Sequence, residues 1–392
     1  MRRAAPLWAT WFAFLSLVSC TSLPGTGSFS SPQSAAGDRS PTVPTSAPIT
    51  LSSAPSGSDA TGSPRRVPLT PPVAVRVGYT PNGANAGIYI ALARGYFQDE
   101  GLDVSLEPFD TGERIIPALA AGQLDASAAP IGAGLFNALA RGVALEMVAG
   151  QVLDVAGPPN GAALVIRKDL FDAGRVRDYA DLRGLRIGHA GISSASGVVF
   201  ARLLALGGFE ERDVEVTEIP AGADQATALI NGRLDAVLMS EPFVTRVVEA
   251  GAGVRWKNLG DIYPNRQATV LLYATPFPQH QSEAAVRFLV AYLRGVRDYV
   301  AAMSGGADRA PIYRILAEYT PIKDLDLYAA LAPANLSTDG GLHTESMLAD
   351  QAFWVQQGLI PQPADLAAAI DLQYLQAARQ RLDRVGVGRP PG

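Results

Sequence analysis

Residues able to do chemistry are scattered along this chain of 392 residues instead of forming one motif. Its three histidines, His189, His280 and His343, stand in unrelated contexts, and its only cysteine is Cys20. These spacings support neither a metal cluster nor a Ser-His-Asp triad. Residues 83–87 lack the third glycine and the following acid of a dinucleotide-binding fingerprint. We therefore predict that the chain is not an enzyme and has no catalytic residue, metal or cofactor.

Small and polar residues gather where predicted strands end and predicted helices begin. Glycine and serine allow close backbone approach, and free N–H groups at helix starts suit an anionic head group. Each position alone is explained equally well as a turn with a helix cap. As a set in both halves of the chain, they predict a binding site for a small solute. The predicted ligand-binding residues are Tyr79, Thr80, Pro81, Asn85, Thr111, Gly112, Pro130, Ile131, His189, Ser193, Ser194, Ser196, Gly222, Ser240, Glu241 and Tyr263.

Two kinds of solute fit these residue types. The hydroxyls of Ser193, Ser194 and Ser196 suit an oxyanion, whereas Glu241 and the tyrosines suit a heteroaromatic ring that bears N–H groups. For Glu241 two interpretations stay open: it caps the helix that follows, or it faces an N–H group of the ligand. We favour the organic ligand, because an unpaired buried carboxylate beside a small anion would be costly.

A faint internal repeat relates the two halves of the chain with a displacement of 110 residues. In this register residues 122–126 align with residues 232–236 without a gap. The period is too long for a solenoid, whose units run roughly 20 to 50 residues, and it fits two similar α/β lobes. Asp125 and Asp235 are equivalent in the repeat. We predict for them one shared structural role and no acid–base chemistry.

Short apolar runs alternate with helical patterns in both halves, which predicts parallel sheets with right-handed crossovers. The predicted strands are residues 73–78, 102–106, 125–128, 145–149, 185–188, 214–219, 236–239 and 269–274. The predicted helices are residues 85–95, 112–121, 130–141, 197–206, 222–230 and 242–250, followed by a helical region over 283–382.

The predicted fold class is α/β, with two Rossmann-like lobes joined by two crossings. Lobe one comprises residues 73–160 plus 268–392, with the C-terminal helical region packed on it, and lobe two comprises residues 161–267. Ligands of open α/β sheets bind beyond the carboxyl ends of the strands. Two such edges joined by two crossings predict a molecule that opens and closes around its ligand.

The N-terminus is typical of an exported lipoprotein. Arg2 and Arg3 precede an apolar stretch over residues 7–18, which is short for a membrane span. Residues 17–20 resemble a lipobox, so we expect a signal peptide over 1–19 and lipidation of Cys20. A plain secretory signal with an incidental cysteine is the alternative.

A tether and an extracytoplasmic location follow from the remaining composition. Residues 20–72 are rich in Ser, Thr, Pro and Gly and predict a disordered tether. The net charge of −5 argues against nucleic acid or an anionic membrane surface as a partner. We expect a monomer at the extracytoplasmic face of the cell membrane, held there by its lipid anchor alone.

The body of the chain, residues 73–382, resembles the substrate-binding proteins of bacterial ABC importers in the nitrate/sulfonate/taurine group, also called the NMT1/THI5-like family. The resemblance is carried by residues 78–81 (GYTP), 88–97 (IYIALARGYF), 100–104 (EGLDV), 121–125 (AGQLD), 231–235 (NGRLD), 241–243 (EPF), 263–267 (YPNRQ) and 319–324 (YTPIKD). It implies the type 2 periplasmic-binding fold, a small solute such as a pyrimidine-like thiamine precursor, a sulfonate or nitrate, and permease and ATPase partners.

Two alternative functions remain beside this resemblance. One is a membrane-tethered sensor of the same fold, which would contact a receptor in place of a permease. The other is an enzyme of the family's pyrimidine-synthesis type. That enzyme has a cysteine-rich iron-binding signature, which this chain lacks because Cys20 is its sole cysteine.

Overall fold

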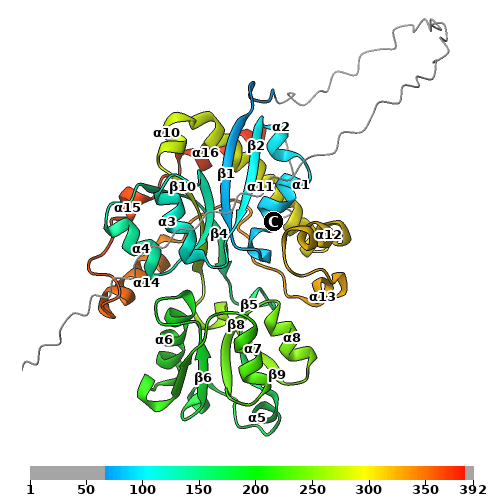
Figure 1. The fold of residues 1–392 in the computed structure, drawn as a ribbon. Helices are drawn as coiled ribbons and strands as arrows, with labels where there is room; N and C mark the ends of the chain where they lie inside the picture. Colours follow the sequence, from blue (N-terminus) through cyan, green and yellow to red (C-terminus); the bar gives the residue numbers. More distant parts are fainter. Residues whose placement is uncertain (1–66, 385–392) are drawn as a thin grey trace, which may run out of the picture. The chain divides into compact units, whose positions relative to one another are not determined.

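Two five-stranded sheets form the framework of the computed structural model, which describes residues 67–384 (Figure 1). The strands of the first sheet are β1 (Val73–Tyr79), β2 (Leu102–Pro108), β3 (Ala126–Pro130), β4 (Leu145–Asp154) and β10 (Arg266–Ala274). Their order is β2-β1-β3-β10-β4. Strand β1 is parallel to β2 and β3, whereas β10 is antiparallel to β3 and β4. We call the part of the chain built around this sheet lobe one.

The second sheet has an equivalent arrangement and forms lobe two. Its strands are β5 (Ala162–Arg167), β6 (Arg186–His189), β7 (Glu215–Glu218), β8 (Ala236–Ser240) and β9 (Gly253–Asn258). Their order is β7-β6-β8-β5-β9, so β5 takes the place that β10 has in lobe one. Strand β5 is antiparallel to β8 and β9.

The prediction of wholly parallel sheets is therefore wrong, since each sheet contains one antiparallel strand. Strands β5 and β10 are the two that the chain enters after crossing from the other lobe. A strand that arrives from the opposite lobe enters its sheet at the carboxyl edge of the parallel strands, so it must run in the other direction. Strands β5 and β9 were also missing from the strands predicted from the sequence.

Lobe one has helices on both faces of its sheet. These helices are α1 (Ala86–Ala93), α2 (Tyr96–Asp99), α3 (Ile115–Ala120), α4 (Ala133–Ala140), α10 (Pro276–His280), α11 (Ser282–Met303), α12 (Ala310–Tyr319), α13 (Leu325–Ala330), α14 (Thr344–Gln356), α15 (Leu366–Ala369) and α16 (Gln373–Arg384). One hydrophobic cluster joins the sheet to α1, α11 and α16, and a second joins it to α3, α4 and α14. The C-terminal helices thus pack on lobe one, as predicted.

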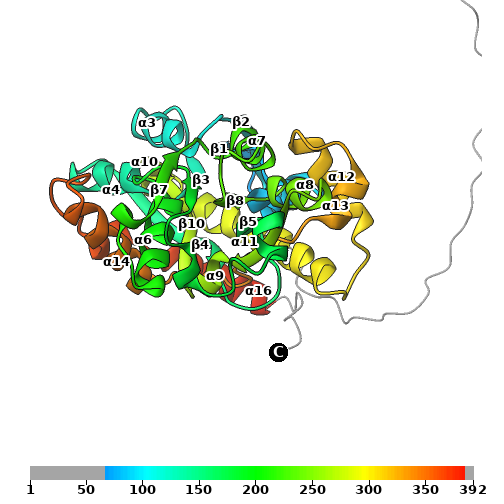
Figure 2. The same ribbon diagram turned by 90° about the horizontal axis from the view of Figure 1, so that it is seen from below.

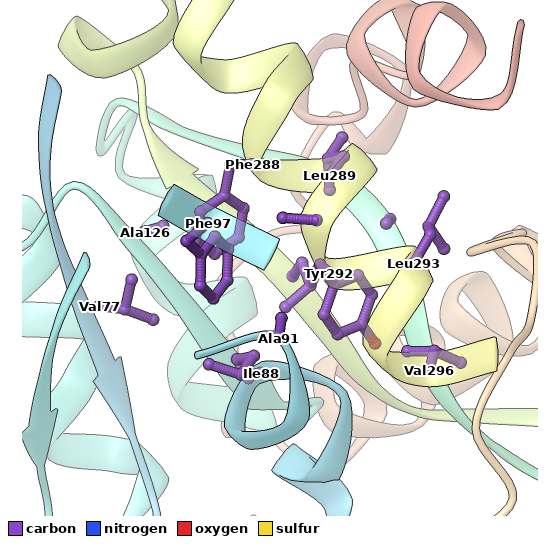
Figure 3. Packing of buried hydrophobic residues seen from close by; sticks show 14 of the residues in the cluster. Val77, Ile88, Ala91, Phe97, Ala126, Phe288, Leu289, Tyr292, Leu293 and Val296 are labelled. Atoms are coloured by element: carbon purple, nitrogen blue, oxygen red, sulfur yellow. The ribbon is translucent and has the colours of Figure 1, made fainter. Parts of the chain in front are cut away.

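Close packing of α1 against α11 builds the larger of these two clusters. Figure 3 shows Ala91 of α1 beside Tyr292 of α11, with Phe288 and Val296 on either side of Tyr292 along α11. The two helices approach so closely that a Cβ added to Gly295 would lie 2.1 Å from the carbonyl oxygen of Gly87. Helix α1 is apolar over most of its surface because it lies between the sheet and α11.

Lobe two is smaller, and its helices also cover both faces of the sheet. They are α5 (Lys168–Asp172), α6 (Ala195–Gly207), α7 (Ala223–Ile230), α8 (Phe243–Glu249) and α9 (Leu259–Ile262). Helices α6 and α9 share one hydrophobic cluster, and α7 and α8 share another. Single turns of 3-10 helix occur at η1 (Gly83–Asn85), η2 (Gly112–Arg114), η3 (Tyr179–Leu182) and η4 (Glu211–Asp213). Figures 1 and 2 agree in placing α6 on the side of α4 and α14, and α8 on the side of α12 and α13.

The predicted equivalence of Asp125 and Asp235 appears in their bonding. Each aspartate accepts from the backbone N–H and the Nε of one arginine at its Oδ2, and from an Nη2 at its Oδ1; the arginine is Arg76 in lobe one and Arg186 in lobe two. In both lobes the arginine lies in one strand, β1 or β6, and the aspartate directly precedes the neighbouring strand, β3 or β8. The structure confirms one shared structural role.

Two crossings connect the lobes, over residues 155–161 and 263–265. The N–H of Asn265 in the second crossing donates to the carbonyl of Asp154, just before the first crossing, at 2.8 Å, and a Cβ added to Gly260 of α9 would lie 2.0 Å from the carbonyl oxygen of Val155. No helix within residues 67–384 is both long and apolar enough for a membrane span.

The predicted signal peptide, the lipidation site Cys20 and the tether as far as residue 66 lie outside the described residues. Leu69, which the predicted tether included, donates its N–H to the carbonyl of Glu100 at 3.3 Å and packs against lobe one.

Candidate functional site

Loops at the carboxyl ends of strands from the two lobes meet. The N–H of Ala133, after β3, donates to the carbonyl of Ser193, after β6, at 3.0 Å. Glu241, which follows β8, accepts at Oε1 from the N–H of Ala332 in lobe one at 3.3 Å. The loops after β3 and β6 therefore meet, whereas Glu241 contacts a segment of lobe one that follows α13.

Thr80 and Asn85 belong to one polar group at the end of β1. The carbonyl of Thr80 accepts from Asn85 Nδ2 at 2.8 Å and from the Tyr89 hydroxyl at 3.4 Å. Asn85 in turn accepts at Oδ1 from Gln151 Nε2 at 3.0 Å, and both amides are buried. Pro81 is half-buried in the same turn. These bonds fix the loop that leads from β1 into α1.

Three tyrosine rings pack together beside this loop. Tyr79 meets the edge of Tyr89 with ring centroids 5.5 Å apart, and Tyr89 stacks on Tyr319 at 5.1 Å. Burial raises the pKa of Tyr79 and of Tyr319, so both hydroxyls keep their protons at neutral pH. Lobe one thus places a rigid aromatic group at the end of β1.

The loops after β2 and β3 are in contact. A Cβ added to Gly112 would lie 2.4 Å from Cδ of Pro130, so glycine permits this approach. Thr111 and Pro130 are exposed. Ile131 is different: its side chain is fully buried in the core, and its N–H donates to the carbonyl of Ala268 at 2.9 Å.

In lobe two the side chains of residues 190–196, which we call the serine loop, bond mainly within the loop itself. Ser194 Oγ donates to the carbonyl of Gly191 at 2.7 Å, and Ser196 Oγ accepts from the N–H of Ala190 at 2.9 Å. The two hydroxyls lie 2.9 Å apart. The side chain of Ser193 is exposed, while its carbonyl makes the contact with lobe one. Two of the three predicted hydroxyls therefore have partners within the loop.

His189 is a buried residue at the end of β6. Its ring stacks on Phe200 with centroids 4.7 Å apart, and its Nδ1 accepts from the N–H of Gly191 at 3.0 Å. Burial lowers the pKa of His189. The imidazole is therefore neutral at neutral pH and carries its proton on Nε2. The bond that its Nδ1 accepts from Gly191 orders the start of the serine loop.

Gly222 and Ser240 complete the lobe-two strand ends. Gly222 precedes α7 with a φ of 134°, a left-handed value that favours glycine, and a Cβ there would lie 3.8 Å from the ring of Phe243. Ser240 is exposed at the last position of β8. Within residues 67–384 no hydrogen bond or ring contact joins Ser240, Gly222 or the serine loop to the tyrosine group, so each lobe contributes its own surface at the strand ends.

Glu241 has partners on every side. Its Oε2 accepts from the N–H of Thr245 at 3.0 Å and caps α8, and its Oε1 forms a short ion pair with Arg255. The side chain is only 8% exposed. The assumption of an unpaired carboxylate is wrong, and the capping interpretation is the one supported. Because Glu241 is paired, its carboxylate no longer favours an organic ligand over a small anion.

Tyr263 lies away from the strand ends, beside the second crossing. Its hydroxyl donates to the carbonyl of Ser346 at 3.4 Å, and Arg202 of α6 lies over its ring at 5.6 Å. Burial raises the pKa of Tyr263 to about 12. Its contacts belong to the junction between the lobes.

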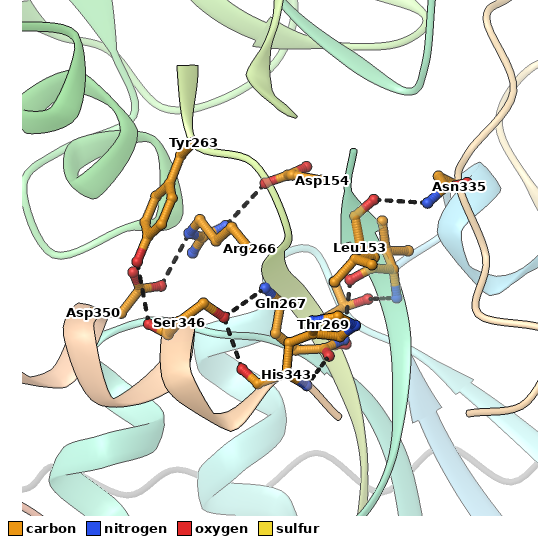
Figure 4. Close-up of polar contacts among 11 residues, drawn as sticks. Leu153, Asp154, Tyr263, Arg266, Gln267, Thr269, Asn335, His343, Ser346 and Asp350 are labelled. Carbon is orange, nitrogen blue, oxygen red and sulfur yellow. Dashed lines mark hydrogen bonds and ion pairs between the residues drawn. The ribbon is translucent and has the colours of Figure 1, made fainter. Parts of the chain in front are cut away.

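A buried ion cluster at that junction was missed from the sequence. Arg266 Nε lies 2.9 Å from Asp350 Oδ2, and Arg266 Nη1 lies 3.4 Å from Asp154 Oδ2 (Figure 4). Burial raises the pKa of Asp350 to about 6, even though Arg266 acts in the opposite direction. The cluster ties the end of β4, the start of β10 and α14 together, so it fixes both crossings.

Three partners of residues near the strand ends also escaped sequence analysis. Gln151 bonds to Asn85 across 66 residues and Tyr319 stacks on Tyr89, whereas Arg255 lies only 14 residues after Glu241. Only Tyr319 had a signal, since it opens the 319–324 motif. In the part of the chain that the structure describes, no three His, Cys, Asp or Glu side chains come together as a metal site.

Comparisons with known proteins agree with this architecture. The bicarbonate transport ATP-binding protein CmpC of Synechocystis sp. is 30% identical over 210 residues, 51% of this chain but only 31% of its own length. The riboflavin-binding protein RibY of Chloroflexus aurantiacus is 25% identical over 86% of this chain and 92% of its own length.

Among solved structures, the periplasmic aliphatic sulphonate binding protein SsuA of Escherichia coli superposes with a TM-score of 0.62 at 19% identity. The match covers 76% of this chain and 97% of SsuA, which establishes the type 2 periplasmic-binding fold. The model of the NMT1-like family matches residues 69–303, more than half of the chain. The chain therefore belongs to the NMT1-like family.

Proposed function

We propose that this chain is the extracytoplasmic solute-binding component of an ABC importer, which captures a small solute between its lobes and passes it to a permease. The observation that carries the proposal is the pairing of two equivalent sheets whose carboxyl-end loops meet across two crossings. Ligands of such sheets bind beyond the carboxyl ends of the strands. Similarity to the riboflavin-binding protein RibY, the bicarbonate transport protein CmpC and the aliphatic sulphonate binding protein SsuA supports a transport role.

The anchor belongs to the same proposal. Cleavage before Cys20 and lipidation of its thiol and amine would hold the chain at the membrane, and the residues that follow would give the body reach. The protein acts as a monomer, without a cofactor and without chemical change to the solute.

The solute is small and polar, and the two lobes offer it different chemistry. Lobe one offers the half-buried ring of Tyr319, which stacks on the buried Tyr89, and the half-buried turn at Thr80 and Pro81. Lobe two presents the serine loop and the start of α6. A ligand screen must therefore contain both flat heterocycles and small oxyanions.

The test is a thermal-shift screen of the full chain against sulfonates, nitrate, bicarbonate, pyrimidines and flavins. A ligand that binds only the folded state stabilises it by about 2.7 kcal/mol at a concentration of 100 Kd. We expect one class to raise the Tm with this concentration dependence and to be recovered unchanged after binding. If none did so, the solute-binding proposal would be contradicted.

A pair of variants locates the binding. Ser240→Phe places a large ring at an exposed strand end that faces the other lobe, whereas Thr217→Phe places it on exposed edge strand β7. The first substitution should abolish the ligand-dependent rise in Tm, and the second should leave it unchanged. Equal responses would move the site away from these strand ends.

An uptake assay separates the importer from the tethered sensor. Cells that lack the chain should take up the identified solute more slowly, and expression of the full chain should restore the rate. Normal uptake in its absence would contradict the importer and favour the sensor.

A further inference from the structure

The two lobes are fastened along the edge formed by α6. Trp354 of α14 donates from Nε1 to the carbonyl of Ile192 at 3.0 Å, beside the bond from Ala133 to Ser193. Val198 of α6 is 6% exposed and belongs to a hydrophobic cluster of lobe one. Lobe two therefore buries part of α6 in the core of lobe one.

This edge continues into the crossings. Arg202 of α6 lies over the ring of Tyr263, and the hydroxyl of Tyr263 is bonded to α14 at Ser346. Arg266 and Asp350 form their buried ion pair next to these residues (Figure 4). Hydrogen bonds, apolar burial and a buried ion pair thus lie along one line from α6 to the second crossing.

The opposite edge is built differently. A cavity of about 420 Å³ separates α8 of lobe two from residues 321–327 of lobe one. Its lining includes Arg246 and Glu249 on α8 and Lys323 and Asp326 across from them. Among the residues that the structure describes, no hydrogen bond or ion pair spans this cavity.

Three side chains that line the cavity, those of Lys323, Asp324 and Arg246, have partners within their own lobes. Lys323 Nζ donates to the carbonyl of Ala317 at 2.5 Å, and Asp324 Oδ1 accepts from the N–H groups that open α13. Arg246 lies over the ring of Phe243 at 5.8 Å. Separation of α8 from residues 321–327 would break none of these contacts.

One bond close to α8 does join the lobes, and it lies at the first crossing. Glu241 accepts from Ala332, and residues just beyond Ala332 pair with β4, where Asn335 Nδ2 donates to the carbonyl of Leu153 at 3.1 Å. Ala334 also lies against Gly161 in that crossing. This bond is near the axis of any rotation about the crossings and changes little when the far end of α8 moves.

We infer that the lobes open asymmetrically: α6 stays fastened to α4 and α14, and the edge between α8 and residues 321–327 separates. Figures 1 and 2 place these two edges on opposite sides of the lobe junction. If the chain captures a solute as proposed above, this moving edge is the entrance. The motion itself does not depend on the identity of the solute.

Distances between pairs of spin labels test the motion in the full chain. Cys20→Ser removes the only cysteine, so labels can be placed at chosen positions. Glu249→Cys with Asp326→Cys spans the α8 edge, and Leu206→Cys with Leu348→Cys spans the α6 edge at residues that are 48% and 53% exposed.

We expect a broad or two-component distance distribution for the α8 pair and one narrow distance for the α6 pair. A narrow distribution for both pairs, equal breadth for both, or breadth confined to the α6 pair would each overturn the inference. None of these outcomes depends on the ligand screen, so a failure here is distinguishable from failure of the proposed function.

A second variant tests the fastening directly. Trp354→Phe keeps an aromatic ring but removes the N–H that reaches Ile192, and Trp256→Phe in β9 is the matched control. Trp354→Phe should broaden the α6-edge distribution, and Trp256→Phe should not. An unchanged α6 edge in Trp354→Phe would contradict the role of this indole in holding the lobes together.

Discussion

The duplicated arginine–aspartate pair allows one substitution to be compared with its own internal control. Asp235 accepts from Arg186 and also from Nη1 of Arg167 at 2.7 Å, whereas Asp125 accepts from Arg76 alone. Asp235 is 10% exposed and Asp125 22%. Burial acts to raise the pKa of Asp235, but the hydrogen bonds and charge of Arg186 outweigh burial and lower it below its usual range. The lobe-two copy is therefore the stronger pair.

The cost of removing each carboxylate follows from these contacts. Breaking a buried ion pair costs about 3 to 5 kcal/mol, and the low end applies to Asp235→Ala because Arg186 is 35% exposed. At Asp125 the exposed pair contributes up to about 1 kcal/mol and the bond from the Arg76 N–H about 1 more. We expect a loss of about 3 kcal/mol for Asp235→Ala and about 1 to 2 kcal/mol for Asp125→Ala.

Thermal denaturation followed by circular dichroism measures the difference. At roughly 2 to 4 °C per kcal/mol, Asp235→Ala should lower the Tm by roughly 6 to 12 °C, clearly more than Asp125→Ala. Asp→Asn at either position keeps an acceptor for the backbone N–H and should fall between the wild type and the alanine variant. Equal losses, or a larger loss at Asp125, would refute the account of the pair.

Two further predictions concern the crossings and the core. Burial raises the pKa of Asp350 in the folded state from 3.8 to about 6, so the protonated form of Asp350 favours the fold. This contribution to the free energy of unfolding, about 3 kcal/mol, is present below pH 4 and is lost as the pH rises to 6. Asp350→Asn should flatten that part of the pH dependence in urea unfolding, and an unchanged slope would contradict the prediction. Gly295→Ala drives a methyl group against the backbone of Gly87 and should cost about 1 to 3 kcal/mol, whereas Gly134→Ala in α4, where a Cβ meets nothing within 4 Å, should gain about 0.5 to 1 kcal/mol; urea midpoints that move in the same direction would count against this packing.

Much of the fold follows from local patterns in the sequence. The runs at β1 and β8 are short and mostly apolar, and the turn before β3 or β8 repeats in both halves because an equivalent aspartate must meet an equivalent arginine. Strand β5 is equally apolar, but its place in the sheet depends on neighbours that begin at residues 236 and 253. Its direction is a property of the crossings and not of its own residues.

The candidate site divides in the same way. Positions at strand ends, such as Thr80 and Ser194, could be predicted from turn chemistry. Their partners could not, since the bond from Gln151 to Asn85 spans 66 residues and that from Arg266 to Asp350 spans 84. The cap that Glu241 forms on α8 was one of the two interpretations left open, but its ion pair with Arg255 was missed, because nothing in residues 241–243 indicates that partner.

The antiparallel strands β10 and β5 have a consequence for biosynthesis. All strands of the second sheet lie within residues 162–258, whereas the first sheet needs β10, which begins at Arg266, after that whole segment. Chains are made from the N-terminus, and non-local pairings form slowly. The lobe that begins second can thus complete its sheet first, while β1 to β4 wait with an open gap between β3 and β4 for the strand that closes it.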